Sequence, residues 1–247
     1  MRGGGESCGC FPTGRHYPGI AHLLRAPTVG IASEFDETLD WHDIPIVMLD
    51  TETTGREAST ERIIELAIVR GQGGQIVSRD AWLIHPGRPI PPDSTAVHGI
   101  KDADVADKPS FADVCSEILQ ALQGAIPAAY NASFDRGFLL AEVRRAGRRD
   151  EIDAPAVRDG VAWVDPLIWA RHLFATAKSR KLTEVAQMLG VELEQAHRAT
   201  ADAEAALQVM YAMRKDHRVP ATYGSFIQEQ LRLLRSQDEA RAMWRNR

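Results

Sequence analysis

The most informative stretch of the chain is Ile46-Val47-Met48-Leu49-Asp50-Thr51-Glu52. It consists of a short apolar run followed by two acids that stand two residues apart. A run of this kind, bounded by polar residues and Gly55, is typical of a strand that is buried on both faces. Residues i and i+2 of a strand point to the same face, so the carboxylates of Asp50 and Glu52 can converge on one point. The stretch therefore predicts a central strand that ends in a pair of acids.

Strand and helix patterns alternate in the rest of the chain. Apolar runs between turn signals predict strands at 46–49, 63–70, 75–84, 128–130 and 161–164. Apolar stripes at helical spacing predict helices at 111–122, 134–146, 166–175, 181–189 and 200–214. Residues 86–92 are too rich in proline for a helix or a central strand and are read as a loop. The residues that follow, around 92–108, are also read as a loop. Three consecutive strands followed by alternating helices and strands predict an α/β fold with a mixed five-stranded sheet flanked by helices.

The composition along the chain predicts three parts. Residues 1–43 are rich in Gly and Pro and sustain no period, so we read them as an extension. Residues 44–214 carry the strand and helix patterns and form the predicted domain. Residues 215–247 form a basic tail, in which 223–245 has the pattern of an amphipathic helix.

The overall composition is that of an ordinary soluble protein, with 44% hydrophobic and 26% charged residues. No stretch approaches the roughly 20 apolar residues that cross a bilayer, and the N-terminus lacks the apolar core of a secretory signal. Three cysteines are too few for a disulfide framework, so we expect a cytoplasmic protein. The net charge of −5 disfavours nucleic-acid binding, but cations bound to the acids would reverse the local sign. Net charge therefore does not decide the partner.

Two further acids and a histidine stand at the starts of predicted helices. Asp135 lies in the first turn of a helix, where the positive end of the helix dipole favours its ionised form. Asp202 follows His197 by five residues, in a segment whose alanines allow close packing on a sheet. Taken singly, each residue has an ordinary structural explanation, such as a helix-start acid or a buried structural histidine. Converging carboxylates repel one another unless one is protonated or a cation binds, and oxygen ligands suit Mg²⁺ or Mn²⁺.

In their order along the chain, these motifs resemble the DEDDh 3′–5′ exonucleases, a family that includes the epsilon proofreading subunit of bacterial DNA polymerase III, ribonuclease T and oligoribonuclease. The matching segments are Leu49-Asp50-Thr51-Glu52-Thr53-Thr54-Gly55, Val97-His98-Gly99-Ile100, Asn131-x-x-Phe134-Asp135 and His197-x₄-Asp202. The resemblance covers about residues 44–214, and it departs at Tyr130, where many members carry histidine. It implies a ribonuclease-H-like α/β fold.

The resemblance also implies a site and a mechanism. Two divalent cations, Mg²⁺ or Mn²⁺, would be held by Asp50, Glu52, Asp135 and Asp202, with Asp50 bridging them. His197 would accept the proton of the attacking water near neutral pH. The substrate would be bound by Thr51, Thr53, His98, Gly99, Ile100, Asn131 and Phe134. For Phe134 a role as a core aromatic residue stays open beside this one.

These inferences predict a metal-dependent 3′–5′ exonuclease that releases nucleoside 5′-monophosphates from DNA with a free 3′ end, in proofreading or repair. The alternatives are an RNA-directed exonuclease, a catalytically silent nucleic-acid-binding module and, less favoured, a metal phosphatase. A DNA polymerase or a sliding clamp is an expected partner. The peptide Gln230-Leu231-Arg232-Leu233-Leu234 resembles clamp-binding peptides, although the same residues would also serve to pack the tail helix on the domain.

Overall fold

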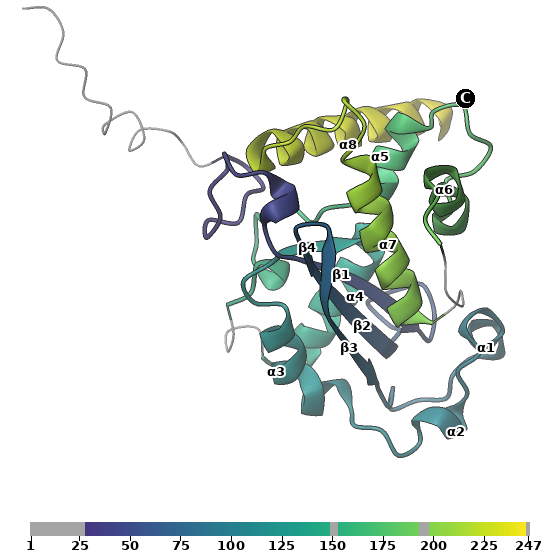
Figure 1. Ribbon diagram of the computed structural model, residues 1–247. Coiled ribbons are helices and arrows are strands. Elements are labelled where there is room, and N and C mark those ends of the chain that lie inside the picture. Colours follow the sequence, from purple (N-terminus) through teal and green to yellow (C-terminus); the bar gives the residue numbers. More distant parts are fainter. Residues whose placement is uncertain (1–27, 149–152, 193–197, 246–247) are drawn as a thin grey trace, which may run out of the picture.

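The computed structural model describes residues 28–148, 153–192 and 198–245. Its centre is a mixed four-stranded sheet in the order β3-β2-β1-β4 (Figure 1). The strands are β1 (Ile46–Thr53), β2 (Ile63–Gln72), β3 (Gln75–Leu83) and β4 (Ile126–Ala129). β1 pairs antiparallel with β2 and parallel with β4, and β2 pairs antiparallel with β3. The predicted α/β class and the mixed sheet are confirmed.

Alternation along β1 divides its side chains between two cores. Ile46 and Met48 point into one core, which contains buried residues of α5, α6, α7 and α8. Val47 and Leu49 point into the other core, which contains buried residues of α3 and α4. Both faces of the strand are therefore covered, as its continuous apolar run predicts. The same alternation continues into the acids, which it assigns to the face covered by α7.

Helices cover both faces of the sheet (Figure 1). One face carries α3 (Phe111–Ala121) and α4 (Ala132–Arg145). The other carries α5 (Pro166–Leu173), α6 (Leu182–Leu189), α7 (Ala199–Met213) and α8 (Tyr223–Arg245). Helix α7 packs directly against β1 and β2. Its side chains on this side are small, since Ala199, Ala203 and Ala206 of the helix are buried. The predicted close approach of this alanine-rich helix to the sheet is confirmed.

The predicted fifth strand at 161–164 is wrong, because this segment forms only isolated bridges, Val161 with Gly30 and Val164 with Ala128. Val164 donates its N–H to the carbonyl of Pro127 and accepts the N–H of Ala129. The next bond of a continued parallel ladder would need an N–H from Pro127, which proline lacks. The ladder therefore ends after one bridge, and α5 begins two residues after it.

Residues 86–91 form no helix or strand, as the prolines predict, but the segment 92–108, also read as a loop, contains two short helices, α1 (Pro92–His98) and α2 (Asp102–Val105). Pro92 occupies the first helical position of α1, where the missing N–H costs nothing. Ile90, Ile100 and Val105 form a small core with Ile64 of β2, which holds this segment against the sheet. Burial against β2 thus gives helical structure to residues that show little helical pattern.

The segments that flank the predicted domain lie against it in the part of the chain described. Before β1, a 3-10 helix η1 (Trp41–Asp43) buries Trp41, whose ring stacks on Phe226 of α8 with centroids 4.7 Å apart. A second 3-10 helix, η2 (Pro155–Val157), precedes the bridging segment. Helix α8 spans the residues predicted for it and packs on α5. The division of the chain at residues 44 and 214 stays a prediction.

The peptide that resembles a clamp-binding motif is largely buried in α8. Gln230 is 2% exposed and Leu233 is 5% exposed, while Leu231 and Leu234 pack against the core from partly buried positions. A docking peptide must be accessible, so this geometry supports the packing explanation for the motif.

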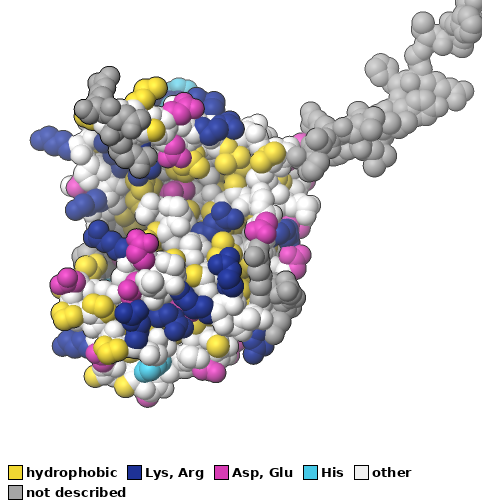
Figure 2. Space-filling view, turned by 180° about the vertical axis from the view of Figure 1, so that it is seen from behind, with side chains coloured by type: hydrophobic (Ala, Val, Ile, Leu, Met, Phe, Trp, Pro, Cys, Tyr) yellow, Lys and Arg dark blue, Asp and Glu magenta, His cyan; other side chains and the backbone are white. Residues whose placement is uncertain are grey.

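The molecular surface carries charges of both signs. On the face seen from behind in Figure 2, Lys and Arg side chains alternate with acidic ones, and a hydrophobic area lies in the upper half. Within the described ranges, no helix combines the length and the apolar character needed to cross a bilayer.

Candidate active site

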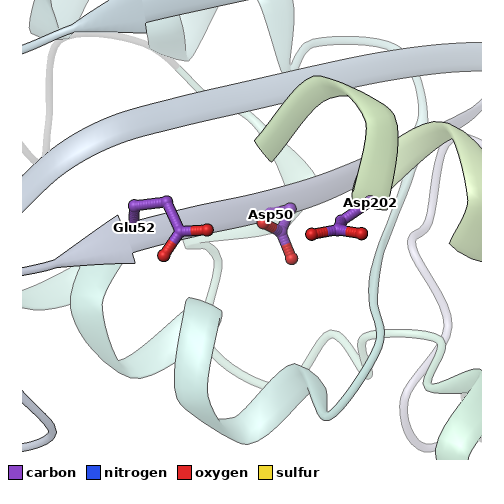
Figure 3. A group of neighbouring side chains, drawn as sticks. All are labelled: Asp50, Glu52 and Asp202. Atoms are coloured by element: carbon purple, nitrogen blue, oxygen red, sulfur yellow. The ribbon is translucent and has the colours of Figure 1, made fainter. Parts of the chain in front are cut away.

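Three predicted acids meet where β1 passes beneath α7. Asp50 and Glu52 extend from the same face of β1, and Asp202 extends from the first turn of α7 (Figure 3). Each offers one carboxylate oxygen such that all three oxygens lie within 4.8 Å of one another. In Figure 3 Asp50 lies between the other two carboxylates. Oxygens at this spacing, on half-buried side chains, can share a divalent cation.

The fourth predicted acid, Asp135, approaches this cluster from α4. It is 4% exposed and accepts a hydrogen bond of 2.8 Å from the hydroxyl of Thr51. Because Thr51 lies between Asp50 and Glu52 on β1, this bond ties the start of α4 to the acid-bearing strand. Asp135 is also close enough to Asp50 to raise the pKa of that carboxyl. The structure thus brings all four predicted acids together.

His197, the predicted general base, lies outside the described residues. The next residue, Arg198, is the N-cap of α7 and begins the described part of this segment. The role of His197 as a base therefore stays a prediction.

Glu65 is a buried acid that the sequence analysis missed. It stands on β2 directly opposite Glu52 of β1 and is 3% exposed. Its carboxylate accepts a bond of 3.2 Å from the guanidinium of Arg198 and one of 3.4 Å from the N–H of Ala199. Glu65 therefore holds the start of α7 against β2. A single acid inside the apolar run of β2 was the available signal.

The acids repel one another in a region with little solvent. Burial, together with the charges of Asp135, Glu52 and Asp202, raises the pKa of Asp50 well above its ordinary value. Burial also raises the pKa of Glu52, to about 7, with neighbouring acids adding to the effect. The pKa of Asp135 is raised by burial and partly lowered by its bond from Thr51. Such a cluster holds protons or a cation, because bare carboxylates at this spacing are unfavourable.

We expect the stability of the metal-free protein to fall as the pH rises from about 4.5 to about 7. The folded state keeps the Glu52 proton up to a pKa of about 7, whereas an unfolded chain releases it near 4.5. The unfolded state then binds fewer protons in this interval, and a rise in pH favours unfolding. A divalent ion binds only the ionised acids, so Mn²⁺ should raise the melting temperature more at pH 8 than at pH 5.5.

Thermal melts at both pH values, with EDTA or with MnCl₂, measure this difference directly. The Mn²⁺ shift at each pH is the melting temperature with MnCl₂ minus that with EDTA. The readout is the difference between the shifts at the two pH values, because other titrating groups affect the MnCl₂ and EDTA melts at one pH equally. Asp50→Asn should remove most of the shift at pH 8. An equal Mn²⁺ shift at both pH values would contradict proton competition at the cluster.

The predicted substrate loop forms a pocket beside the acids. Gly99 ends α1 with a φ of 77°, and the N–H of Ile100 donates to Nδ1 of His98 at 3.1 Å. A pocket of about 490 Å³ is lined by Leu83, His98, Gly99, Ile100, Asp104, Lys108 and Arg198. Arg198 connects this pocket to the cluster, since it is paired with Glu65. A contact of this pocket with substrate stays a prediction.

The other predicted substrate residues have contacts within the protein. The hydroxyl of Thr53 donates to the carbonyl of Gly55 at 2.6 Å, and that of Thr51 is bonded to Asp135. Phe134 is half-buried, with its ring centroid 4.8 Å from that of Phe138. Asn131 is exposed and precedes α4. Their contacts with substrate stay predictions.

A central strand that presents clustered carboxylates beside an open pocket is the arrangement of a metal-dependent enzyme for phosphate esters. The model of the exonuclease family that contains RNase T matches residues 47–210. The chain therefore belongs to this family, the DEDD 3′–5′ exonucleases.

Curated relatives match about three quarters of the chain. Over 186 residues, 75% of this chain, it is 35% identical to the PolC-type DNA polymerase III of Lacticaseibacillus paracasei, and the match covers 12% of that protein. Over 195 residues it is 32% identical to a DNA polymerase III subunit epsilon-like protein of Rhodobacter capsulatus, covering 75% of this chain and 26% of the relative. The match thus spans only a small part of the length of these relatives.

Solved structures share the fold. Exonuclease X in complex with 5′ overhanging duplex DNA is 26% identical, with a TM-score of 0.57 over 73% of this chain and 98% of that one. Exonuclease I of E. coli with a dA16 oligonucleotide is 18% identical, with a TM-score of 0.60 over 71% of this chain and 41% of that one. The second likeness concerns the fold alone.

Proposed function

We propose that the protein is a metal-dependent 3′–5′ exonuclease that hydrolyses the terminal phosphodiester of DNA. The observation that carries this proposal is the convergence of the Asp50, Glu52 and Asp202 oxygens within 4.8 Å at the end of β1. Membership of the exonuclease family supports the reaction class. The products would be nucleoside 5′-monophosphates, released one at a time from a free 3′ end.

The site residues fit a pair of Mg²⁺ or Mn²⁺ ions. All four predicted ligands offer oxygen atoms, which suit these ions. Burial and neighbouring acids raise the pKa values of Asp50, Glu52 and Asp135, as expected where bound cations would supply the missing positive charge. Asp50, Glu52, Asp135 and Asp202 would hold the ions, which supply charge stabilisation to the transition state and acidify a bound water. Thr51 keeps Asp135 oriented, and Glu65 fixes the helix that carries Asp202. His197 would accept the water proton.

DNA is the favoured substrate because the proteins similar to this chain include DNA polymerase III proteins and a DNA-bound exonuclease. The curated relatives are PolC-type and epsilon-like DNA polymerase III proteins, and the exonuclease X structure contains duplex DNA. Proofreading or repair beside a separate DNA polymerase is the role these relatives support. A clamp partner would need a contact other than Gln230-Leu231-Arg232-Leu233-Leu234, since Gln230 and Leu233 are buried.

Oligomers labelled at the 5′ end test both the direction and the substrate. We expect the protein with Mg²⁺ or Mn²⁺ to shorten a DNA oligomer stepwise from its 3′ end, and to act more slowly on RNA of the same sequence. A 3′-phosphorylated DNA of the same length is the matched control and should resist digestion. Full activity in excess EDTA, or equal cleavage of circular single-stranded DNA, is incompatible with the proposal. Faster digestion of RNA would favour the RNA-directed alternative.

A further inference from the structure

Helix α8 contacts residues 163–165 through the buried side chain of Gln230. The side-chain carbonyl of Gln230 accepts the N–H of Asp165 at 2.9 Å, and its amide donates to the carbonyl of Trp163 at 2.9 Å. Gln230 is 2% exposed, so both bonds form away from competing water. They fix the backbone of residues 163–165, the segment that bridges to β4 and then begins α5.

Asp165 passes this constraint to the helix that carries Asp135. Its carboxylate accepts the N–H of Asn131 at 2.9 Å, the N–H of Ala132 at 3.1 Å and the N–H of Leu167 at 2.9 Å. One carboxylate therefore serves the start of α4 and the start of α5. Asp165 is 7% exposed, which leaves these N–H groups as its principal compensation.

The start of α4 depends on this outside partner. Its N-cap, Asn131, has a φ of 73° and a ψ of 50°, and its side chain makes no capping bond. Within the described ranges, Asn131 is the one non-glycine residue with a positive φ. Asparagine adopts the left-handed conformation more readily than most other residues, and contacts to the surrounding backbone hold it there. Asp165 supplies those contacts to the backbone of Asn131 and Ala132.

The chain of contacts ends at the acid cluster. Asp135 lies in the first turn of α4, three residues after Ala132, and its carboxylate is bonded to Thr51 of β1. A shift of this turn would move Asp135 relative to Asp50. The start of α4 is thus fixed from two sides, by Thr51 through Asp135 and by Asp165 through the helix backbone.

We propose that Gln230 and Asp165 are positioning residues, through which α8 sets the place of Asp135 in the active site. The inference rests on the proposed function, because it assigns a catalytic role to Asp135. It extends the site beyond the residues matched by the family model, which ends at 210, whereas α8 begins at Tyr223. A motif that resembles a clamp-binding peptide thereby receives a role inside the enzyme.

The test compares two substitutions on α8. Gln230→Met keeps the approximate size of the side chain and removes both bonds to 163–165. Gln237→Met is the matched control, because Gln237 lies two turns later and donates to the carbonyl of Ile168 at 2.9 Å, with no bond to Asp165. Asp165→Asn tests the contact between Asp165 and the start of α4. The amide of the new asparagine places an N–H donor where the N–H of Asn131 or of Ala132 requires an acceptor. Each protein is assayed for kcat, KM, Mn²⁺ affinity and melting temperature.

We expect Gln230→Met and Asp165→Asn each to lower kcat by about tenfold and to weaken Mn²⁺ binding by a similar factor, with KM within about twofold. The double variant should lose no more than the more damaged single variant, because both act through one chain of contacts. Gln237→Met should lower the melting temperature and leave kcat per folded molecule unchanged. Equal kcat in the Gln230→Met, Gln237→Met and parent proteins would overturn the inference, whatever their melting temperatures.

Two outcomes separate this inference from the proposed function. If the parent protein digests no DNA with Mg²⁺ or Mn²⁺, the proposed function fails, while Mn²⁺ affinity still reports on the position of Asp135. If the parent protein is active and neither Gln230→Met nor Asp165→Asn changes kcat or Mn²⁺ affinity, the positioning role alone fails.

Discussion

Asp50→Asn is expected to lower the DNA exonuclease rate by on the order of 10³-fold or more, with the protein still folded. Asp50 lies between Glu52 and Asp202, so in the proposed site its carboxylate would help to hold the catalytic ions. Asparagine keeps the shape of the side chain and removes its charge. The rate loss should appear in kcat, since the bulk of the substrate-binding surface is unchanged.

The same substitution should leave the melting temperature of the metal-free protein unchanged or raise it. Asp50 has a strongly raised pKa because burial and four neighbouring acids disfavour its ionised form. Removing that acid relieves repulsion that is greatest above neutral pH, where the neighbours are ionised. Circular dichroism melts at pH 8 in EDTA measure this effect. Asp238→Asn, at an exposed position on α8, is the control for a simple loss of negative charge.

A lower melting temperature together with retained activity would contradict the site assignment. In that case Asp50 would be a structural acid, and the catalytic ions would need other ligands. A metal-binding role predicts loss of activity with a stable fold, together with loss of the Mn²⁺ shift at pH 8.

His197→Ala is expected to lower kcat by about 10²–10⁴-fold, the usual contribution of a positioned general base. KM for DNA should change little, because the proton acceptor acts on the attacking water rather than on the substrate backbone. The acidic limb of the kcat/KM profile reports the pKa of the base in the free enzyme, and it should be lost in the variant. Rates measured from pH 5.5 to 9 with saturating Mn²⁺ test both points.

His217→Ala provides the comparison for this second substitution. His217 follows α7, and its side chain is 92% exposed beside Asp216, so its removal should leave the pH profile unchanged. A His197→Ala enzyme within twofold of the parent rate, with its acidic limb retained, would show that another group accepts the proton.

Much of the site follows from local pattern. The alternation of Ile46, Val47, Met48 and Leu49 fixes which face of β1 carries Asp50 and Glu52, because side chains of a strand alternate with period two. The alanines on the sheet-facing side of α7 predict the close approach that brings Asp202 to Asp50 and Glu52. These features depend on spacings of a few residues, which a single sequence displays directly.

Other features depend on contacts between distant segments. Pro127 is visible in the sequence, yet its effect on the expected fifth strand requires knowing that Val164 pairs beside it. The helices at 92–105 form because Ile100 and Val105 find a small core against Ile64. A sequence pattern identifies the apolar residues but does not identify the surface that buries them.

By itself, the sequence determined the fold class, the central strand and the acids of the exonuclease motifs, since these rest on local periodicity and motif order. Only the tertiary structure decided the roles of Glu65, Asp165 and Gln230. Gln230 reads as a docking residue along the chain and is a buried bridge in the fold, because its partners lie 65 and 67 residues away. The function of a polar side chain depends on which distant backbone groups it satisfies, and folding alone brings those groups to it.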